Sequence, residues 1–541
     1  MNLNLMTQPK MNIYRPQILN LLLMRVEALL KKYRQNIAIV GYQSLGKTAL
    51  IFDLLYKIKN FNLIPIYITL KTKSIELFAK NFMGILLYQY LAEEKEKVED
   101  NLDFLINKSK EKIPRTAKEI LKILKLINKK CTSDEIFSNV LDLPQILYEE
   151  TQKPVILIFD EFQNFEKLGL NRPFLELSNK IMVQKNIMYI IISSRPYRAR
   201  NILTKKLSLL FGNFEIVEIN PFDAKTADDF ISQELKDFLI EEDLKNFLIY
   251  LSGGYPFYLK IFLDQLKSIS LEKNSGKINE EIFLKSLEEL MHQNHGIINQ
   301  YFYNKYRVLL NKSGSNLFPS ILQAIADGKK KPSQIASYLA KKTPEVNRYI
   351  NKLIEKDIIT KKGIFTHIND PLFACWIKFV FSRDQDSFDM NIYGATKKFE
   401  DDLARILAEF KSESQKKISN RIKEVFELFE NDIIELDKKR FMLTHFDEII
   451  TNDHNGLSLI NARRLKKSWF CCVEKEFVDE VKVNEFIKKI KRKECLKRIL
   501  IALDGIDVNA RLKALEEKVW IWDQKILNEL FSIFERPRFL K

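Results

Sequence analysis

A glycine-containing segment of eight residues constrains the fold of this chain more than any other feature. Gly41-Tyr42-Gln43-Ser44-Leu45-Gly46-Lys47-Thr48 fits the pattern GxxxxGK[ST], between an apolar run at 37–40 and a helical pattern at 49–55. In such a strand–loop–helix unit, backbone N–H groups and the helix N-terminus point at phosphates. We predict a nucleotide-binding loop, the P-loop, in which Lys47 reaches the β- and γ-phosphates and the Thr48 hydroxyl ligates Mg²⁺.

Four further apolar runs predict strands of the same sheet. They cover 63–70, 155–159, 188–192 and 214–219, and helical segments separate them. Near-continuous apolar runs are typical of a parallel sheet that carries helices on both faces. We therefore predict an α/β fold for this region, with its ligand beyond the carboxyl ends of the strands.

Two carboxylates, Asp160 and Glu161, follow the apolar run at 155–159. A carboxylate at the end of a buried strand is costly unless it meets an opposite charge, and Mg²⁺ is a suitable partner. We predict that Asp160 holds Mg²⁺ through water and that Glu161 orients or deprotonates the attacking water. The alternative is that a carboxylate here only caps the next helix.

Together these residues resemble the AAA+/STAND P-loop ATPases, and the closest branch is similar to the archaeal-type ATPases with a C-terminal winged helix. Three short elements extend the resemblance. Tyr14-Arg15-Pro16 resembles the N-terminal box over the adenine, and Ile192-Ser193-Ser194-Arg195 resembles a strand-end signature that senses the γ-phosphate. Gly253-Gly254-Tyr255-Pro256 is similar to the GxP element of a helical lid.

The resemblance implies ATP and Mg²⁺ as ligands and ATP hydrolysis as the reaction. It places Arg15 and Pro256 near the nucleotide and gives Arg195 a catalytic role beside Lys47 and Glu161. The alternative for Arg15 and Arg195 is a solvated surface arginine.

The patterns divide the chain into five expected parts. From Thr48 to Asp160 the chain runs 160 − 48 = 112 residues, longer than one crossover needs, so a helical insertion is expected. The parts are an ATPase core at 12–225 with the insertion at about 75–150, a helical lid at 226–300, a winged helix at 301–385, a helical connector at 386–438 and a C-terminal domain at 439–541.

The sequence pattern of residues 316–367 predicts three helices followed by a β-hairpin, which would be the wing of a winged helix. Thr343-Pro344-Glu345 opens the third helix with a capping threonine and a proline at its first position. Its apolar residues recur at helical spacing, which leaves a polar outer face in the recognition position of a helix-turn-helix. We predict nucleic-acid contacts from this face and from the wing, at Asn347, Arg348, Asn351, Lys352, Lys361 and Lys362.

The alternative for this winged helix is a regulatory lid that folds back on the ATPase. The basic residues that flank its third helix favour nucleic acid slightly; they are Lys329, Lys330, Lys331, Lys341, Lys342, Lys361 and Lys362.

The last hundred or so residues alternate strands and helices, which predicts a second α/β region. The order resembles the restriction-endonuclease-like fold, whose active form needs an acidic residue and then D/E-x-K to hold a divalent metal. Asp447 and Lys475 match this pattern loosely, but Val473 stands where the carboxylate should be. We predict a nuclease-derived binding module rather than an active nuclease.

Composition adds a bias in charge. The chain has 87 Lys+Arg against 71 Asp+Glu, a net charge of +16. Such a surplus favours polyanions such as nucleic acid, although lysine enrichment from an AT-rich coding sequence is an alternative. No apolar run approaches the length of a membrane span, the N-terminus lacks a signal-peptide pattern, and the five cysteines show no metal spacing. We therefore expect a cytoplasmic location and no membrane partner.

Four functions are compatible with these features. The first is an ATP-driven molecular switch whose output is DNA binding or assembly with a protein partner or with itself. The others are an ATP-regulated nuclease or defence component, an initiator-type ATPase similar to origin-recognition proteins, and a STAND signalling ATPase without nucleic-acid contact.

Overall fold

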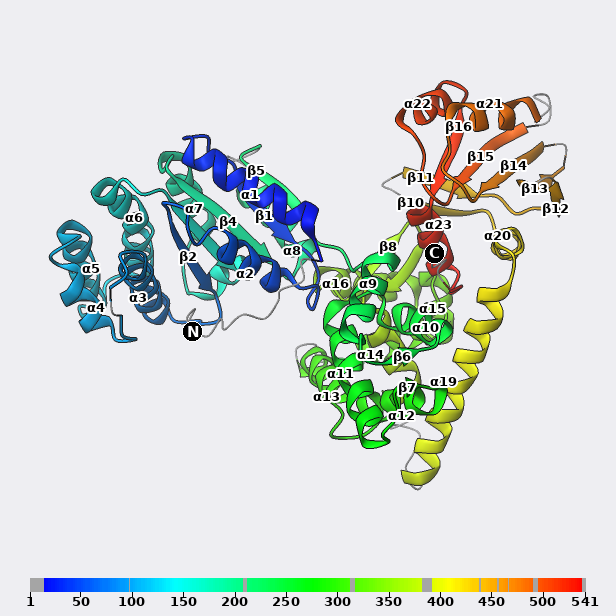
Figure 1. Ribbon diagram of the computed structural model, residues 1–541, viewed down its shortest axis with the longest axis horizontal. Helices are drawn as coiled ribbons and strands as arrows, with labels where there is room; N and C mark the ends of the chain where they lie inside the picture. The colour runs from blue at the N-terminus through cyan, green and yellow to red at the C-terminus, as the bar shows by residue number, and fades with distance from the viewer. Residues whose placement is uncertain are drawn as a thin grey trace. The chain divides into compact units, whose positions relative to one another are not determined.

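Two compact units make up the computed structural model (Figure 1). The first unit is Met1–Pro221 with Glu355–Asp357, and the second is Phe222–Ile354 with Ile358–Lys541. The expected boundary at 385/386 falls outside the described residues. Across the described ranges, no helix is long and apolar enough to cross a membrane. These ranges are 14–96, 98–207, 212–311, 317–381, 392–436, 439–454, 457–465, 467–489 and 495–537.

A parallel sheet organises the first unit. Its strands lie in the order β2-β3-β4-β1-β5, and all neighbouring pairs are parallel. Every residue of β1, β3 and β4 is buried. The predicted α/β fold with a parallel sheet is thus confirmed. The strands are β1 (Asn36–Val40), β2 (Ile64–Thr69), β3 (Val155–Asp160), β4 (Ile187–Ser193) and β5 (Phe214–Glu218).

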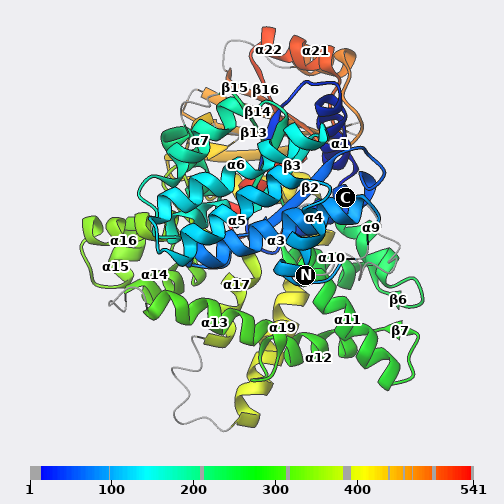
Figure 2. The same ribbon diagram turned by 90° about the vertical axis from the view of Figure 1, so that its left-hand side faces the viewer.

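Helices cover the sheet. The segment between β2 and β3 forms α3–α6, which lie in front of the sheet in Figure 2. Side-chain caps at Ser74, Asn101 and Thr132 begin α3, α4 and α6. The helices are α1 (Pro16–Leu30), α2 (Lys47–Lys57), α3 (Ile75–Glu93), α4 (Leu102–Ser109), α5 (Pro114–Asn128), α6 (Ser133–Thr151), α7 (Pro173–Val183) and α8 (Pro196–Asn201).

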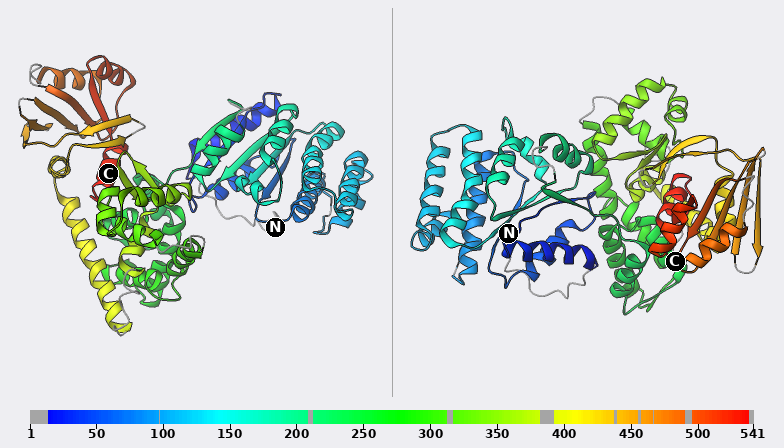
Figure 3. Two further views of the ribbon diagram at one scale, coloured as in Figure 1. Left: turned by 180° about the vertical axis from the view of Figure 1, so that it is seen from behind. Right: turned by 90° about the horizontal axis from the view of Figure 1, so that it is seen from above.

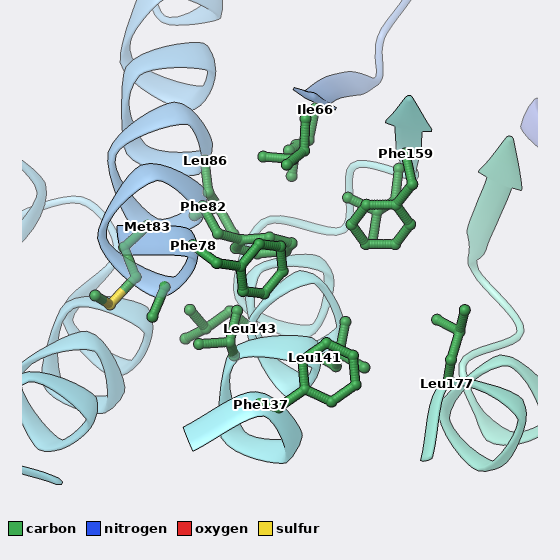
Figure 4. Packing of buried hydrophobic residues seen from close by; sticks show 14 of the residues in the cluster. Ile66, Phe78, Phe82, Met83, Leu86, Phe137, Leu141, Leu143, Phe159 and Leu177 are labelled. Atoms are coloured by element: carbon green, nitrogen blue, oxygen red, sulfur yellow. The ribbon is translucent and has the colours of Figure 1, made fainter. Parts of the chain in front are cut away.

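An aromatic cluster joins this helical segment to the sheet. The ring of Phe78 on α3 lies 6.0 Å from Phe82, 5.9 Å from Phe137 and 5.8 Å from Phe165, between centroids. Phe159, next to the end of β3, lies 5.0 Å from Phe165. Figure 4 shows Phe78, Phe82 and Phe137 with Phe159 in one apolar layer. The cluster fixes the position of β3, and therefore of Asp160 and Glu161.

The second unit begins with helices. Those before the hairpin are α9 (Ala224–Glu234), α10 (Glu242–Ser252), α11 (Pro256–Glu272), α12 (Glu280–Met291), α13 (Ile297–Asn311), α14 (Leu317–Ala326), α15 (Pro332–Tyr338) and α16 (Thr343–Glu355), with a short strand pair β6 (Leu239–Ile240) and β7 (Lys277–Ile278). The hairpin β8 (Ile359–Lys362) and β9 (Phe365–Ile368) precedes α17 (Pro371–Trp376). The long helix α19 (Ile392–Gln415), yellow in Figure 3, runs alongside α12 and α10.

The C-terminal part of this unit is a mixed sheet with helices on both faces. Its order is β12-β13-β14-β15-β16, where the first three strands are antiparallel and the last three are parallel. The strands are β12 (Glu448–His454), β13 (Leu457–Arg464), β14 (Lys467–Glu474), β15 (Cys495–Ala502) and β16 (Val519–Asp523). Side chains of α20 (Ile418–Phe426) and α23 (Gln524–Ile533) pack on one face, and those of α21 (Glu480–Lys489) and α22 (Val508–Glu516) on the other.

The structure differs from the sequence prediction between 432 and 464. The expected helical connector to 438 ends in a strand, β10 (Asp432–Leu436), which pairs with β11 (Lys439–Leu443). The polar residues around Asp447 lead into the edge strand β12. Exposed and half-buried residues alternate along the start of β12. Polar residues occupy both faces of such an edge strand. The alternation of apolar and polar residues that identifies a strand is therefore weak in its sequence.

Phe78→Ala tests the aromatic cluster. Phe78 is 1% exposed, whereas its neighbour Leu77 is 55% exposed. Removing the ring leaves a cavity, so we expect the free energy of unfolding of the first unit to fall by about 3–5 kcal/mol. The matched variant Leu77→Ala should change it by less than about 0.5 kcal/mol. Hydrogen exchange of β2 and β3 peptides at increasing urea concentration measures both; equal effects would contradict the role of this cluster.

Candidate functional site

The backbone of the P-loop has the geometry that its glycines allow. A Cβ at Gly41 would lie 2.5 Å from the Ile219 carbonyl oxygen, so only glycine fits between the ends of β1 and β5. Gly46 caps α2 with φ 79°, a left-handed conformation that favours glycine. Helix α2 begins at Lys47, and its first N–H groups therefore line the loop as predicted.

Lys47 is a buried cation. Its side chain is 7% exposed, and its Nζ donates to the carbonyl oxygens of Gly41 at 3.0 Å and Tyr42 at 2.6 Å. Burial lowers the pKa of Lys47 to about 8; nearby Glu161 and Asp160 oppose the shift, and Arg15 adds to it. A phosphate would supply the anion that favours the charged form.

Asp160 and Glu161 lie at the carboxyl end of β3. Burial raises the pKa of Asp160, and a hydrogen bond from the Tyr67 hydroxyl opposes that rise. Glu161 adopts φ 58°, a left-handed conformation uncommon outside glycine. Its Oε2 accepts a hydrogen bond of 2.8 Å from Ser194 Oγ, and it also contacts the Gln163 amide. The left-handed turn sends Glu161 toward the end of the neighbouring strand β4.

The end of β4 lies between the P-loop and these carboxylates. The Gly41 N–H donates to the Ser193 carbonyl oxygen at 3.2 Å, and the Ser193 Oγ accepts from the Arg195 N–H at 3.0 Å. Arg195 then caps α8, and its side chain is exposed. The structure thus brings Lys47, Asp160, Glu161 and the predicted sensor segment to one edge of the sheet.

Arg15 has a contact that the sequence did not indicate. Its guanidinium donates to the carbonyl oxygens of Leu45 at 3.2 Å and Asn220 at 2.7 Å. Arg15 therefore braces the P-loop backbone against the segment after β5. The sequence alone could not indicate this contact, because Asn220 lies far from Arg15 along the chain.

Pro256 lies in the second unit, at the first position of α11. The preceding Gly253 and Gly254 both have positive φ, and a Cβ at Gly254 would lie 2.3 Å from the Phe222 carbonyl oxygen. The Tyr255 hydroxyl donates to the Asn369 carbonyl oxygen at 3.0 Å. This segment therefore packs on the residues that follow β9.

The predicted recognition face lies on α16. Val346, Ile350 and Leu353 are buried, as their spacing predicts. Arg348, Asn351 and Lys352 are exposed on the opposite side, and Asn347 is half-buried. The Lys361 Nζ donates to Asn347 Oδ1 at 3.3 Å.

Several lysines near the hairpin have carboxylate partners from the C-terminal part. Lys362 lies 3.5 Å from Glu529, and Lys330 lies 3.0 Å from Glu535. Lys331 is paired with Asp432 at 2.7 Å and Glu430 at 2.8 Å. A backbone hydrogen bond also joins the hairpin to β10, because the Ile364 N–H donates to the Ile433 carbonyl oxygen at 3.0 Å.

The loose match of Asp447 and Lys475 to a nuclease site is wrong. Asp447 lies beside the end of β13, where its Oδ2 accepts from the Leu465 N–H at 2.9 Å. Arg463 in that region pairs with Ser468 at the start of β14, whereas Lys475 follows the end of β14. Seven residues of strand separate Ser468 from Lys475, about 23 Å. Sequence order does not reveal which end of a strand a residue joins.

The comparisons with known proteins support the prediction for the first half. A family model described as an ATPase domain predominantly from Archaea matches residues 21–262. The match supports a P-loop ATPase domain in this part of the chain. The match covers less than half of the chain and assigns nothing to the remainder. No curated protein sequence matches the chain.

Similar solved structures include ATPases of low sequence identity. A Walker-type ATPase of Pyrococcus abyssi is 18% identical, over 67% of this chain and 95% of that chain, with a TM-score of 0.47. The ORC2 protein of Aeropyrum pernix in ADPNP–ADP complexes is 12% identical, over 74% and 96%, with a TM-score of 0.43. The Thermotoga maritima RuvB Holliday junction branch migration motor is 12% identical, over 70% and 96%, with a TM-score of 0.33. Likenesses at this level assign no function.

The pKa of Lys47 predicts how nucleotide affinity depends on pH. Free Lys47, with a pKa of about 8, is charged below that pH and neutral above it. Phosphate binding favours the charged form, so above pH 8 binding must take up a proton. We expect a nearly constant dissociation constant between pH 7 and 8, then a weakening that approaches tenfold per pH unit.

Fluorescent-nucleotide titrations from pH 7 to 9.5 measure this dependence. The matched variant Lys47→Arg stays charged over the whole range, so its affinity should be nearly independent of pH. The same slope in both proteins would assign the titration to another group.

Proposed function

We propose that the chain is a molecular switch that binds and hydrolyses ATP and couples nucleotide state to DNA binding. The observation that carries the ATP part is the gathering of Lys47, Asp160 and Glu161 at one edge of the sheet, within the region of the family match. Lys47 binds the β- and γ-phosphates, and Glu161 orients the attacking water. Arg195, at the end of β4, responds to the γ-phosphate.

The residues present suit a bound Mg²⁺. Thr48 offers a hydroxyl and Asp160 a carboxylate, and oxygen ligands of this kind are those that Mg²⁺ prefers. Such sites use one or two protein groups together with waters and phosphate oxygens. When bound, Mg²⁺ would neutralise charge on the phosphates.

Glu161→Gln tests the catalytic assignment. The amide keeps the shape of the side chain but cannot accept a proton from water, so we expect ATP hydrolysis to fall by about 10²–10⁴-fold. ATP binding should persist in this variant, whereas Lys47→Ala should lose it. Radiolabelled ATP hydrolysis and equilibrium binding give the two readouts, with the exposed Glu27→Gln on α1 as control. Full hydrolysis by Glu161→Gln would remove Glu161 from the mechanism.

The outer face of α16 supports the DNA part of the proposal. Arg348 and Lys352 lie 5.2 and 5.3 Å from the Tyr349 ring, so two cations share one exposed face. Such residues contact phosphates, and asparagine reads adenine. Lys362 is left out of the proposed DNA-binding surface, because its ammonium group is paired with the Glu529 carboxylate. DNA binding is therefore assigned to Asn347, Arg348, Asn351, Lys352 and Lys361.

A route for coupling lies within the second unit. A Cβ at Gly253 would lie 2.8 Å from Pro371, and the Tyr258 hydroxyl donates to Asp370 at 2.5 Å. Asp370 and Pro371 lie two and three residues after the end of β9. A motion of Pro256 would reach the hairpin through these contacts.

DNA binding is tested by paired substitutions in α16. Arg348→Ala with Lys352→Ala removes two cations from the exposed face, so we expect DNA affinity to fall at least tenfold and its dependence on salt to weaken. Lys362→Ala is the matched control and should change affinity by less than about twofold. Fluorescence anisotropy with duplex DNA, at several salt concentrations and with ATP, ADP or neither, measures both. Absence of DNA binding in every nucleotide state would favour the signalling ATPase.

A further inference from the structure

Tyr67 touches the predicted metal site from the neighbouring strand. Its hydroxyl donates to Asp160 Oδ2 at 2.6 Å. Tyr67 lies on β2, which pairs with β3 in the register Tyr67↔Ile158 and Thr69↔Asp160. The hydroxyl therefore reaches along the sheet to the carboxyl end of β3.

The alternation of β2 explains why a tyrosine can stand here. Ile64, Ile66 and Ile68 are buried in the core, and the residues between them are only half-buried. Since successive side chains of a strand point to opposite faces, Tyr67 lies on the face away from that core. There the ring of Phe52 from α2 packs at 5.7 Å between centroids.

Both predicted metal ligands meet this hydroxyl. Thr48, one residue into the helix that follows the P-loop, lies close enough to Tyr67 to interact with its oxygen. Asp160 has a second contact from the backbone N–H of Glu161. Tyr67 thus interacts with both Thr48 and Asp160.

Lys47 is an alternative partner for Asp160. The two charges interact. A direct ion pair between them would make Lys47 unavailable to phosphate and Asp160 unavailable to the metal. Within the described residues no ion pair joins them; Lys47 donates instead to the Gly41 and Tyr42 carbonyl oxygens. The Tyr67 hydrogen bond holds one carboxylate oxygen on the side of β2.

We propose that Tyr67 is a positioning residue for the Mg²⁺ site: its hydroxyl holds the Asp160 carboxylate in the orientation that a bound Mg²⁺ requires. This inference rests on the proposed function, because it assigns Asp160 to metal binding. Outer groups that orient a ligand typically contribute about 10–100-fold to metal affinity.

Tyr67→Phe tests the inference, since it removes the hydroxyl and keeps the ring against Phe52. Binding of a fluorescent, non-hydrolysable ATP analogue is measured in EDTA and then over a Mg²⁺ titration. We expect unchanged affinity in EDTA, within about twofold, and a Mg²⁺ half-saturation concentration raised about tenfold or more. The control is Tyr56→Phe on α2, whose side chain is 52% exposed; it should behave as the unsubstituted protein.

The outcomes separate the two levels of the proposal. If the unsubstituted protein binds the analogue with Mg²⁺ dependence and Tyr67→Phe has the same half-saturation, the inference on Tyr67 is overturned and the proposed function stands. Loss of affinity by Tyr67→Phe in EDTA would also overturn it, because the hydroxyl would then support the loop rather than the metal. If the unsubstituted protein binds no nucleotide, the proposed function itself fails.

Discussion

A buried cation beside two carboxylates is the constraint on which the ATPase domain depends. Lys47 is nearly excluded from water, and burial lowers its pKa to about 8. Asp160 is buried beside it, and burial raises its pKa. Each group is held in the environment that disfavours its charged form. In the proposed function, a triphosphate would supply the anion that Lys47 needs and Mg²⁺ the cation that Asp160 needs, so each ligand would favour binding of the other.

The sheet order makes this arrangement possible. Strand β4 lies between β1, which leads into the P-loop, and β3, which ends at Asp160. The end of β4 and the residue after it therefore contact both sides, through the Ser193 carbonyl oxygen and Ser194 Oγ. The aromatic cluster behind β3 supplies rigidity that the polar edge lacks. The strained turn at Glu161 is tolerated because the strand before it is fixed on both faces.

The sequence predicted the ATPase domain well because its signals are local. The P-loop and the strand-end pair Asp160–Glu161 each occupy a short stretch whose neighbours define a strand. The bracing by Arg15 and the hydrogen bond of Tyr67 depend on partners far along the chain, so no periodicity could show them. The match of Asp447 with Lys475 failed for the same reason, since strand pairing places them at opposite ends of the sheet.

Some of the lysines that give the chain its surplus of positive charge are paired with carboxylates in the structure. The side chains of Lys330 and Lys331 are only 14% and 16% exposed, and each is paired with a C-terminal carboxylate. These pairs join the turn before α15 to Asp432 on β10 and to Glu535 after α23. Phe365 of the hairpin shares a core with Phe426. Lys330 and Lys331 are therefore less accessible to a polyanion than the exposed Arg348 and Lys352 of α16.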